Sequence, residues 1–136
     1  MSKKKSDTLW AKKKEENGRF FWLPLSQHLE DTKDIIGLLW EHWLSEGQKK
    51  LIEDSLDSVT HDDGLGKRLA QFLAAVHDIG KATPAFQTQR GFANSDDLDI
   101  QLLEKLEQSG FTKISSLQLS SPKKSHHSLA GQYLLS

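Results

Sequence analysis

Residues 69–87, LAQFLAAVHDIGKATPAFQ, contain the features that decide the fold of this chain. The stretch opens with a nearly apolar run that ends at Val76 and predicts a helix. Because this helix has little polar face, we expect it to be central in the domain. His77 and Asp78 follow directly, so two potential metal ligands are placed at the end of the most apolar helix.

The second half of the same stretch predicts where this helix ends and the next one begins. Gly80 is a natural helix stop. Thr83-Pro84 has the pattern of an N-cap followed by proline at the first helical position. A short helix through Phe86 is therefore expected, and a loop should follow it near Gly91.

Outside this stretch, apolar spacings of three and four residues predict further helices and no strand. Ser26 is expected to cap the first of them, which ends near Gly47. The predicted helices cover residues 27–47, 48–55, 95–109 and the segment from about 125 to the end, with Gly110 as the stop of the third. The fold class is therefore predicted as all-α, and the segment 111–124 between the last two helices as irregular.

Composition narrows the possible functions. The 136 residues are enough for one compact domain, and the net charge of −1 argues against a general polyanion-binding protein. With no cysteine, any metal must be held by imidazole and carboxylate groups, and six histidines are available. No secretory signal or membrane-length apolar run occurs, so we expect a cytoplasmic protein without a membrane partner.

The N-terminal residues 1–18 contain two runs of three lysines. Charge runs of this kind are usually solvated. We therefore interpret this segment as a Lys-rich, solvent-exposed arm.

The pair His77 and Asp78 has two interpretations. A carboxylate that follows an apolar helix needs a partner if it is buried, and a metal ion would supply one. Alternatively, the helix simply reaches water there, with Asp78 capping it and His77 packing. The same dipeptide occurs at His61-Asp62 in a Gly- and Asp-rich segment, which predicts a solvated loop. This second copy shows that the dipeptide alone is weak evidence for a metal site.

The other histidines are individually weak candidates for ligands. His28, in the first turn of a predicted helix, could be a capping or half-buried residue, and His42 is expected to pack among tryptophans. His126 and His127 open the last helix, where an exposed basic turn is the alternative. Three predicted helices nevertheless carry a histidine near one end, which suits a metal site in a helical bundle.

The order of these motifs resembles the N-terminal HD nuclease domain of the CRISPR-associated nuclease–helicase of type I interference systems, subtype I-E. The resemblance covers nearly the whole chain, and the stretch from His77 to Gln87 is its most specific part. The motifs are Leu9-Trp10-Ala11-Lys12, Trp22-Leu23-Pro24-Leu25 with His28-Leu29, His77 to Gln87, and His127-Ser128-Leu129-Ala130-Gly131.

The resemblance implies an all-α HD-domain helical bundle that binds two divalent transition metals and degrades single-stranded DNA. His28, His77 and Asp78 resemble ligands of the first metal, and Asp78 would bridge to a second metal held by His127. Lys81 resembles a basic residue beside the site that contacts a phosphate. Imidazole and carboxylate ligands suit iron, manganese, cobalt or nickel. The implied partners are single-stranded DNA and a CRISPR guide-RNA surveillance complex.

The family pattern continues with a Gly-His-His-Gly type motif and a later Asp, which this sequence does not contain. Residues 1–136 are therefore expected to form a partial, C-terminally incomplete HD nuclease domain without the helicase domains. The alternatives are a non-catalytic fragment that binds the surveillance complex, and an HD phosphohydrolase that acts on nucleotides. An incomplete domain would leave apolar surface exposed, so we also expect association.

Overall fold

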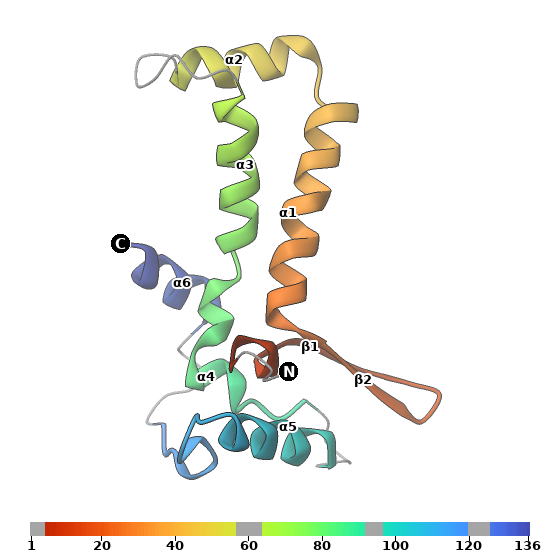
Figure 1. Cartoon of the computed structure of the whole chain (residues 1–136), viewed down its shortest axis with the longest axis vertical. Coiled ribbons are helices and arrows are strands. Elements are labelled where there is room, and N and C mark those ends of the chain that lie inside the picture. The colour runs from red at the N-terminus through yellow and green to blue at the C-terminus, as the bar shows by residue number, and fades with distance from the viewer. Residues whose placement is uncertain (1–4, 57–63, 92–96, 120–125) are drawn as a thin grey trace. The chain divides into compact units, whose positions relative to one another are not determined.

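The structure is a computed structural model that describes residues 5–56, 64–91, 97–119 and 126–136 (Figure 1). It divides into two compact units. The first comprises residues 1–28 and 78–136, and the second comprises residues 29–77. The predicted loop at His61-Asp62 lies outside the described residues. Most described elements are helices, which confirms the predicted fold class, but a two-stranded sheet is an addition to it.

The sheet of the first unit is an antiparallel hairpin of β1 (Trp10–Glu16) and β2 (Arg19–Pro24). Residues 10–16 of the predicted solvated arm thus form a strand in which Trp10 and Ala11 are buried, whereas Lys12 and residues 14–18 are exposed as predicted. The turn between the strands is Asn17-Gly18, with φ of 52° and 73°. Two successive positive φ angles are what a tight type I′ hairpin turn requires, and Asn-Gly is its strongest sequence signal.

Within the described residues of the first unit, the short 3-10 helix η1 (Lys5–Thr8) precedes the hairpin and five helical elements come later in the chain. They are η2 (Ile79–Ala82), α4 (Pro84–Gln87), α5 (Asp97–Gln108), η3 (Ile114–Ser116) and α6 (His127–Leu135). The core of this unit combines Trp10 with Phe86 and with Leu98 and Leu102 of α5. The Trp10 and Phe86 ring centroids are 4.5 Å apart, so the start of β1 packs directly on α4.

The observed helix ends of the first unit agree in part with those predicted from the sequence. Thr83 is the N-cap residue of α4 and Pro84 its first residue, as predicted, although the Thr83 hydroxyl donates to the Gly80 carbonyl at 2.8 Å instead of capping the helix. Gly110, with a φ of 99°, ends α5 as predicted. The Phe111 amide donates to the Leu106 carbonyl at 3.1 Å, which closes the last turn.

The second unit consists of α1 (Leu25–His42) beyond His28, α2 (Glu46–Leu56) and α3 (Leu65–Val76). Trp40 of α1 is buried and its ring reaches Gly66, where an added Cβ atom would lie 2.8 Å from it. The Gly66 amide donates to Glu53 of α2 at 3.0 Å. These contacts join the three helices at one end of the unit.

Three predictions for this region need correction. Helix α1 begins at Leu25, so Ser26 lies inside the helix and is not its cap. Gly47 does not end α1, because α1 ends at His42 and Gly47 belongs to α2. The apolar helix α3 ends at Val76, four residues before Gly80, and it is not a buried central helix, since Phe72 is 54% exposed. Within the described residues, no helix has both the length and the apolar character that crossing a bilayer requires.

Candidate metal centre

Asp78 is the centre of a cluster of charged and imidazole side chains. It is 7% exposed, and its two carboxylate oxygens face different partners. Oδ2 lies 2.7 Å from His28 Nε2 and 2.6 Å from Lys81 Nζ, whereas Oδ1 lies 3.2 Å from His127 Nε2. The burial of Asp78 excludes the alternative that the helix end simply reaches water at this residue.

His28 is held opposite Asp78 by the hairpin. It lies in the first turn of α1, which follows β2 without a loop. The Leu25 amide donates to the Leu9 carbonyl at 2.7 Å, so the start of α1 is tied to the start of β1. The His28 side chain is 12% exposed, and its Nε2 atom points to the carboxylate.

Gln87 connects the start of β1 to the segment that carries Asp78. Its buried amide accepts from the Trp10 amide at 3.1 Å and donates to the carbonyls of Trp10 and Lys81, each at 2.8 Å. The Trp10 indole donates to the Gln87 carbonyl at 3.2 Å. The oxygen and the nitrogen of the Gln87 side-chain amide are therefore both hydrogen-bonded within the protein. Trp10 and Gln87 both lie in the sequence motifs, but no role was predicted for either residue.

His127 is placed by an unusually close packing of α6 on η2. A Cβ atom on Gly80 would lie 1.8 Å from the His127 carbonyl oxygen and 2.5 Å from the Gly131 amide nitrogen. Only glycine permits this approach. The prediction that Gly80 stops a helix is thus wrong, because Gly80 lies within η2 and admits the backbone of α6.

The two histidines at the start of α6 have different environments. His126 is the N-cap of α6, and its Nδ1 accepts from the Ser128 amide at 3.4 Å. His127 turns toward Asp78, and its ring meets Phe86 edge-on at 5.6 Å between centroids. The geometry therefore favours His127 over His126 as a ligand.

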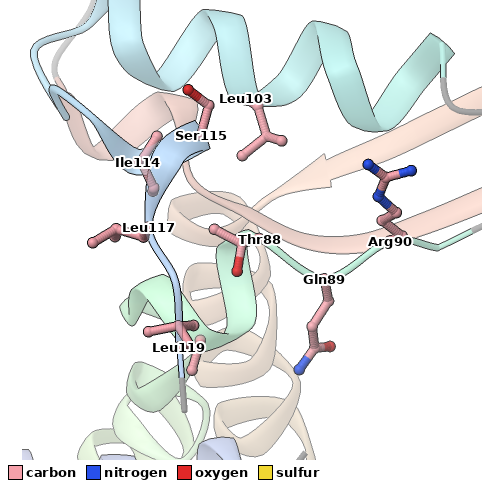
Figure 2. Close-up of a pocket in the computed structure, with 9 residues that line it drawn as sticks. Thr88, Gln89, Arg90, Leu103, Ile114, Ser115, Leu117 and Leu119 are labelled. Atoms are coloured by element: carbon pink, nitrogen blue, oxygen red, sulfur yellow. The ribbon is translucent and has the colours of Figure 1, made fainter. Parts of the chain in front are cut away.

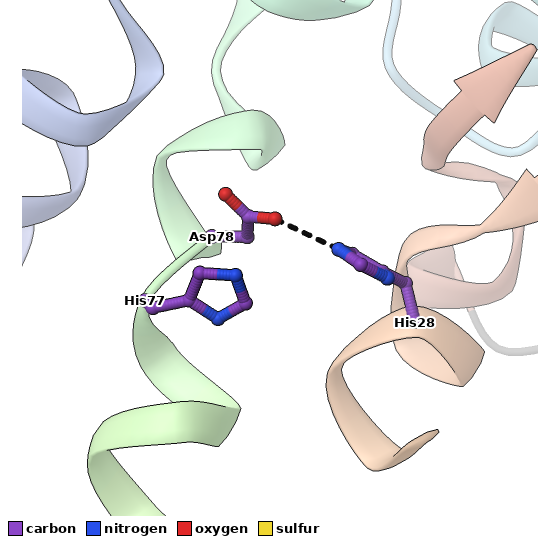
Figure 3. Close-up of side chains that lie close together, drawn as sticks. All are labelled: His28, His77 and Asp78. Atoms are coloured by element: carbon purple, nitrogen blue, oxygen red, sulfur yellow. Dashed lines mark hydrogen bonds and ion pairs between the residues drawn. The ribbon is translucent and has the colours of Figure 1, made fainter. Parts of the chain in front are cut away.

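His77 precedes Asp78 in the chain and has an exposed side chain. Its Nδ1 lies 2.6 Å from the Ala74 carbonyl oxygen. A carbonyl can only accept, so Nδ1 donates this hydrogen bond, and in the neutral ring Nε2 is then the electron-pair donor. This arrangement is common for metal-binding histidines. Ligand atoms of His28, His77 and Asp78 lie within 4.8 Å of one another (Figure 3).

These residues fit a divalent transition metal. Two imidazoles and one carboxylate are suitable donors for such ions. In an octahedral site, neighbouring ligands about 2.1 Å from the metal are roughly 3 Å apart. The 2.7 Å contact between His28 and Asp78 would lengthen only slightly to satisfy this distance. His42 lies outside this cluster: its side chain is 74% exposed at the other end of α1, beside Glu41.

A separate hollow of about 520 Å³ lies between the residues that follow α4, helix α5 and the segment after η3 (Figure 2). Leu103 and Leu117 contribute apolar surface to it, and Gln89 and Arg90 contribute polar groups. None of the four candidate ligands lines this hollow. It is therefore not part of the cluster around Asp78.

Comparison with known proteins identifies the family of this chain. Residues 10–136 match the family model described as "Cas3, HD domain". The chain belongs to this Cas3 HD-domain family. It is also 76% identical over 131 residues to the CRISPR-associated nuclease/helicase Cas3 of Streptococcus thermophilus. That alignment covers 96% of this chain but 14% of the relative. No solved structure matches the chain.

Proposed function

We propose that this chain carries part of a two-metal nuclease centre that cleaves single-stranded DNA in type I CRISPR interference, in the manner of subtype I-E. The observation that carries the proposal is the buried Asp78 carboxylate, whose Oδ2 contacts His28 and whose Oδ1 contacts His127. Membership of the Cas3 HD-domain family favours a nuclease over a nucleotide phosphohydrolase.

In this proposal the described residues divide between two metals. His28, His77 and Asp78 would hold the first metal, and Asp78 with His127 would contribute to the second. Two metals held by these residues would activate water and stabilise the charge that develops on the phosphodiester. We propose that residues outside this sequence complete the second metal, since the chain spans 14% of the length of its relative. Residues 1–136 would then be a partial HD domain.

Asp78 and Lys81 would orient the reacting groups. Lys81 is 7% exposed, and its ammonium lies 2.6 Å from Asp78 Oδ2, so it fixes that carboxylate and adds a positive charge beside the cluster. We propose that the same ammonium attracts a phosphate of the bound strand. The helicase domains and the guide-RNA complex would deliver that strand in the cytoplasm.

Manganese binding tests the metal centre independently of cleavage. We expect the purified chain to bind Mn²⁺ in a calorimetric titration, and His28→Ala to weaken binding by at least about tenfold. His42→Ala is the matched control, because it removes an exposed imidazole from the same helix. An affinity that is unchanged by His28→Ala, or equally reduced by both variants, would contradict the proposal.

Cleavage of a single-stranded oligonucleotide is the second measurement. Any Mn²⁺-dependent cleavage by the chain should disappear in Asp78→Ala and persist in His42→Ala. Hydrolysis of free nucleotides without cleavage of DNA would instead support a nucleotide phosphohydrolase.

A further inference from the structure

The β1–β2 hairpin has two different faces. Antiparallel pairs place Lys13 with Trp22 and Glu15 with Phe20, and Phe20 and Trp22 pack on the core of the first unit. The intervening pairs are Lys12 with Leu23, Lys14 with Phe21 and Glu16 with Arg19. Since side chains alternate along a strand, these three pairs share the opposite face. We call this the outward face.

The outward face presents an aromatic ring to solvent. Phe21 is 50% exposed, although an apolar ring of this size would gain free energy by burial. It lines two hollows. One of about 230 Å³ also involves Lys12 and Lys14, and one of about 350 Å³ also involves Arg19. Phe21 therefore has room for a planar group beside it, with Lys12 and Lys14 along one hollow and Arg19 together with Glu16 along the other.

The charge of the outward face is positive, although the whole chain has a net charge of −1. Lys12, Lys14 and Arg19 contribute three positive charges and Glu16 contributes one negative charge. Glu16 pairs with Lys14 at 3.1 Å in an exposed position, so water and salt screen that contact. The excess of cations is thus local to this surface.

We propose that the outward face of the hairpin binds single-stranded DNA, with Phe21 stacking on a base and Lys12, Lys14 and Arg19 contacting phosphates. Exposed aromatic rings flanked by cations are the usual elements of single-strand binding surfaces. Lys12 and Lys14 are two residues apart on one strand, about 7 Å, and their flexible side chains can adjust to successive phosphates. This inference rests on the proposed function only for the identity of the strand, since no ligand of the metal centre takes part.

The double helix is a poorer fit to the same surface. Stacking on Phe21 requires a base whose face is accessible, and bases inside a duplex are already stacked on their neighbours. We therefore expect a preference for single strands, with little dependence on base sequence.

Fluorescence anisotropy with a labelled thymidine oligonucleotide tests the stacking role. The titration is made in EDTA, so that neither metal binding nor cleavage contributes. Phe21→Ala and Phe21→Leu should each weaken binding about tenfold, and Phe21→Trp should preserve it. Phe72→Ala is the matched control, because Phe72 is similarly exposed, at 54%, on α3. Far-UV circular dichroism confirms that each variant is folded.

The salt dependence tests the phosphate contacts. Lys14→Ala should lower the slope of log affinity against log salt by about 0.7, the value for one phosphate contact on a single strand. Lys50→Ala should leave it unchanged. Lys50 is the matched control because it is also an exposed lysine paired with a carboxylate of its own element, Asp54, at 2.8 Å.

The two proposals fail in different ways. Equal loss of affinity in Phe21→Ala and Phe72→Ala, no loss in either, or equal affinity for duplex DNA would overturn the role of the hairpin. Mn²⁺ binding and cleavage would survive that result. Conversely, absence of Mn²⁺ binding together with Phe21-dependent DNA binding would overturn the metal centre and leave the hairpin proposal standing.

Discussion

The two compact units differ in how they use their charged and apolar side chains. In the first unit, Lys13 and Asp99 are both buried and paired, and the Lys13 ammonium also lies 3.9 Å from the Trp10 ring centroid. In the second unit, the Lys67–Glu41 pair between α3 and α1 is partly exposed. Large apolar side chains are exposed in both units, but of the buried ones among the described residues only Trp40 belongs to the second unit. The exposed ones of the second unit include Ile35, Leu38, Trp43, Leu51, Phe72 and Leu73.

This difference shows which part of the chain holds the candidate centre in place. The first unit has a core of aromatic and leucine side chains and a paired polar interior, so His28, Asp78 and His127 are positioned by packing. The second unit is held by contacts at its helix ends and by polar pairs. Four measurements would break or sharpen this contrast.

Breaking the buried Lys13–Asp99 ion pair should cause the largest loss of stability. Lys13→Met leaves the Asp99 carboxylate buried without its cation, so we expect it to lower the free energy of unfolding by about 3–5 kcal/mol. Lys67→Met removes the exposed pair of the second unit and should lower it by less than about 1 kcal/mol. Urea denaturation measures both. Similar losses in the two variants would remove the contrast between the units.

Adding a methyl group at Gly80 should cause the next largest loss of stability. Gly80→Ala forces the α6 backbone away from η2, which we expect to cost about 3 kcal/mol and to separate His127 from Asp78. Gly47→Ala in α2 is the control, since an added Cβ atom there meets nothing within 4 Å. It should be neutral or stabilise by about 0.5 kcal/mol. A fully stable Gly80→Ala protein would contradict the observed packing of α6.

The exposed apolar side chains of the second unit predict self-association. We expect the chain to associate as its concentration rises, and Phe72→Lys to reduce this association while changing stability by less than about 0.5 kcal/mol. Sedimentation velocity over a concentration series measures the effect. A monodisperse monomer at all concentrations would refute this prediction.

The smallest expected effect is on the titration of Glu41. A hydrogen bond from Lys67 lowers the pKa of Glu41 from its ordinary value of 4.5. A lowered folded-state pKa contributes stability above the unfolded-state pKa, and that contribution is lost as pH falls through the folded-state pKa. Lys67→Met should therefore raise the pKa of Glu41, as followed by NMR. An unchanged pKa would show that the pair does not form in solution.

Some helix ends could be predicted from the sequence alone. So could the kinds of side chain that are available to hold a metal. Thr83-Pro84 and Gly110 mark their helix ends because φ preferences act within a few residues. Without cysteine, the ligands had to be histidines and carboxylates, and the motif order predicted the family that residues 10–136 match. The hairpin could also have been predicted, because Asn17-Gly18 is a turn signal between two short runs of strand-forming residues.

Contacts between distant residues could not be derived in this way. Lys13 looks like its neighbours Lys12 and Lys14, and its burial depends on Asp99, 86 residues later. Gly80 has the appearance of a helix stop until the backbone of α6 is placed against it. Local propensity fixes the conformation of a segment, whereas the burial of a side chain depends on what the rest of the chain packs against it. For this reason the sequence alone limited the candidate ligands to histidines and carboxylates, and the motif resemblance grouped His28, Lys81 and His127 with Asp78. The tertiary structure adds the contacts by which these three side chains meet at Asp78.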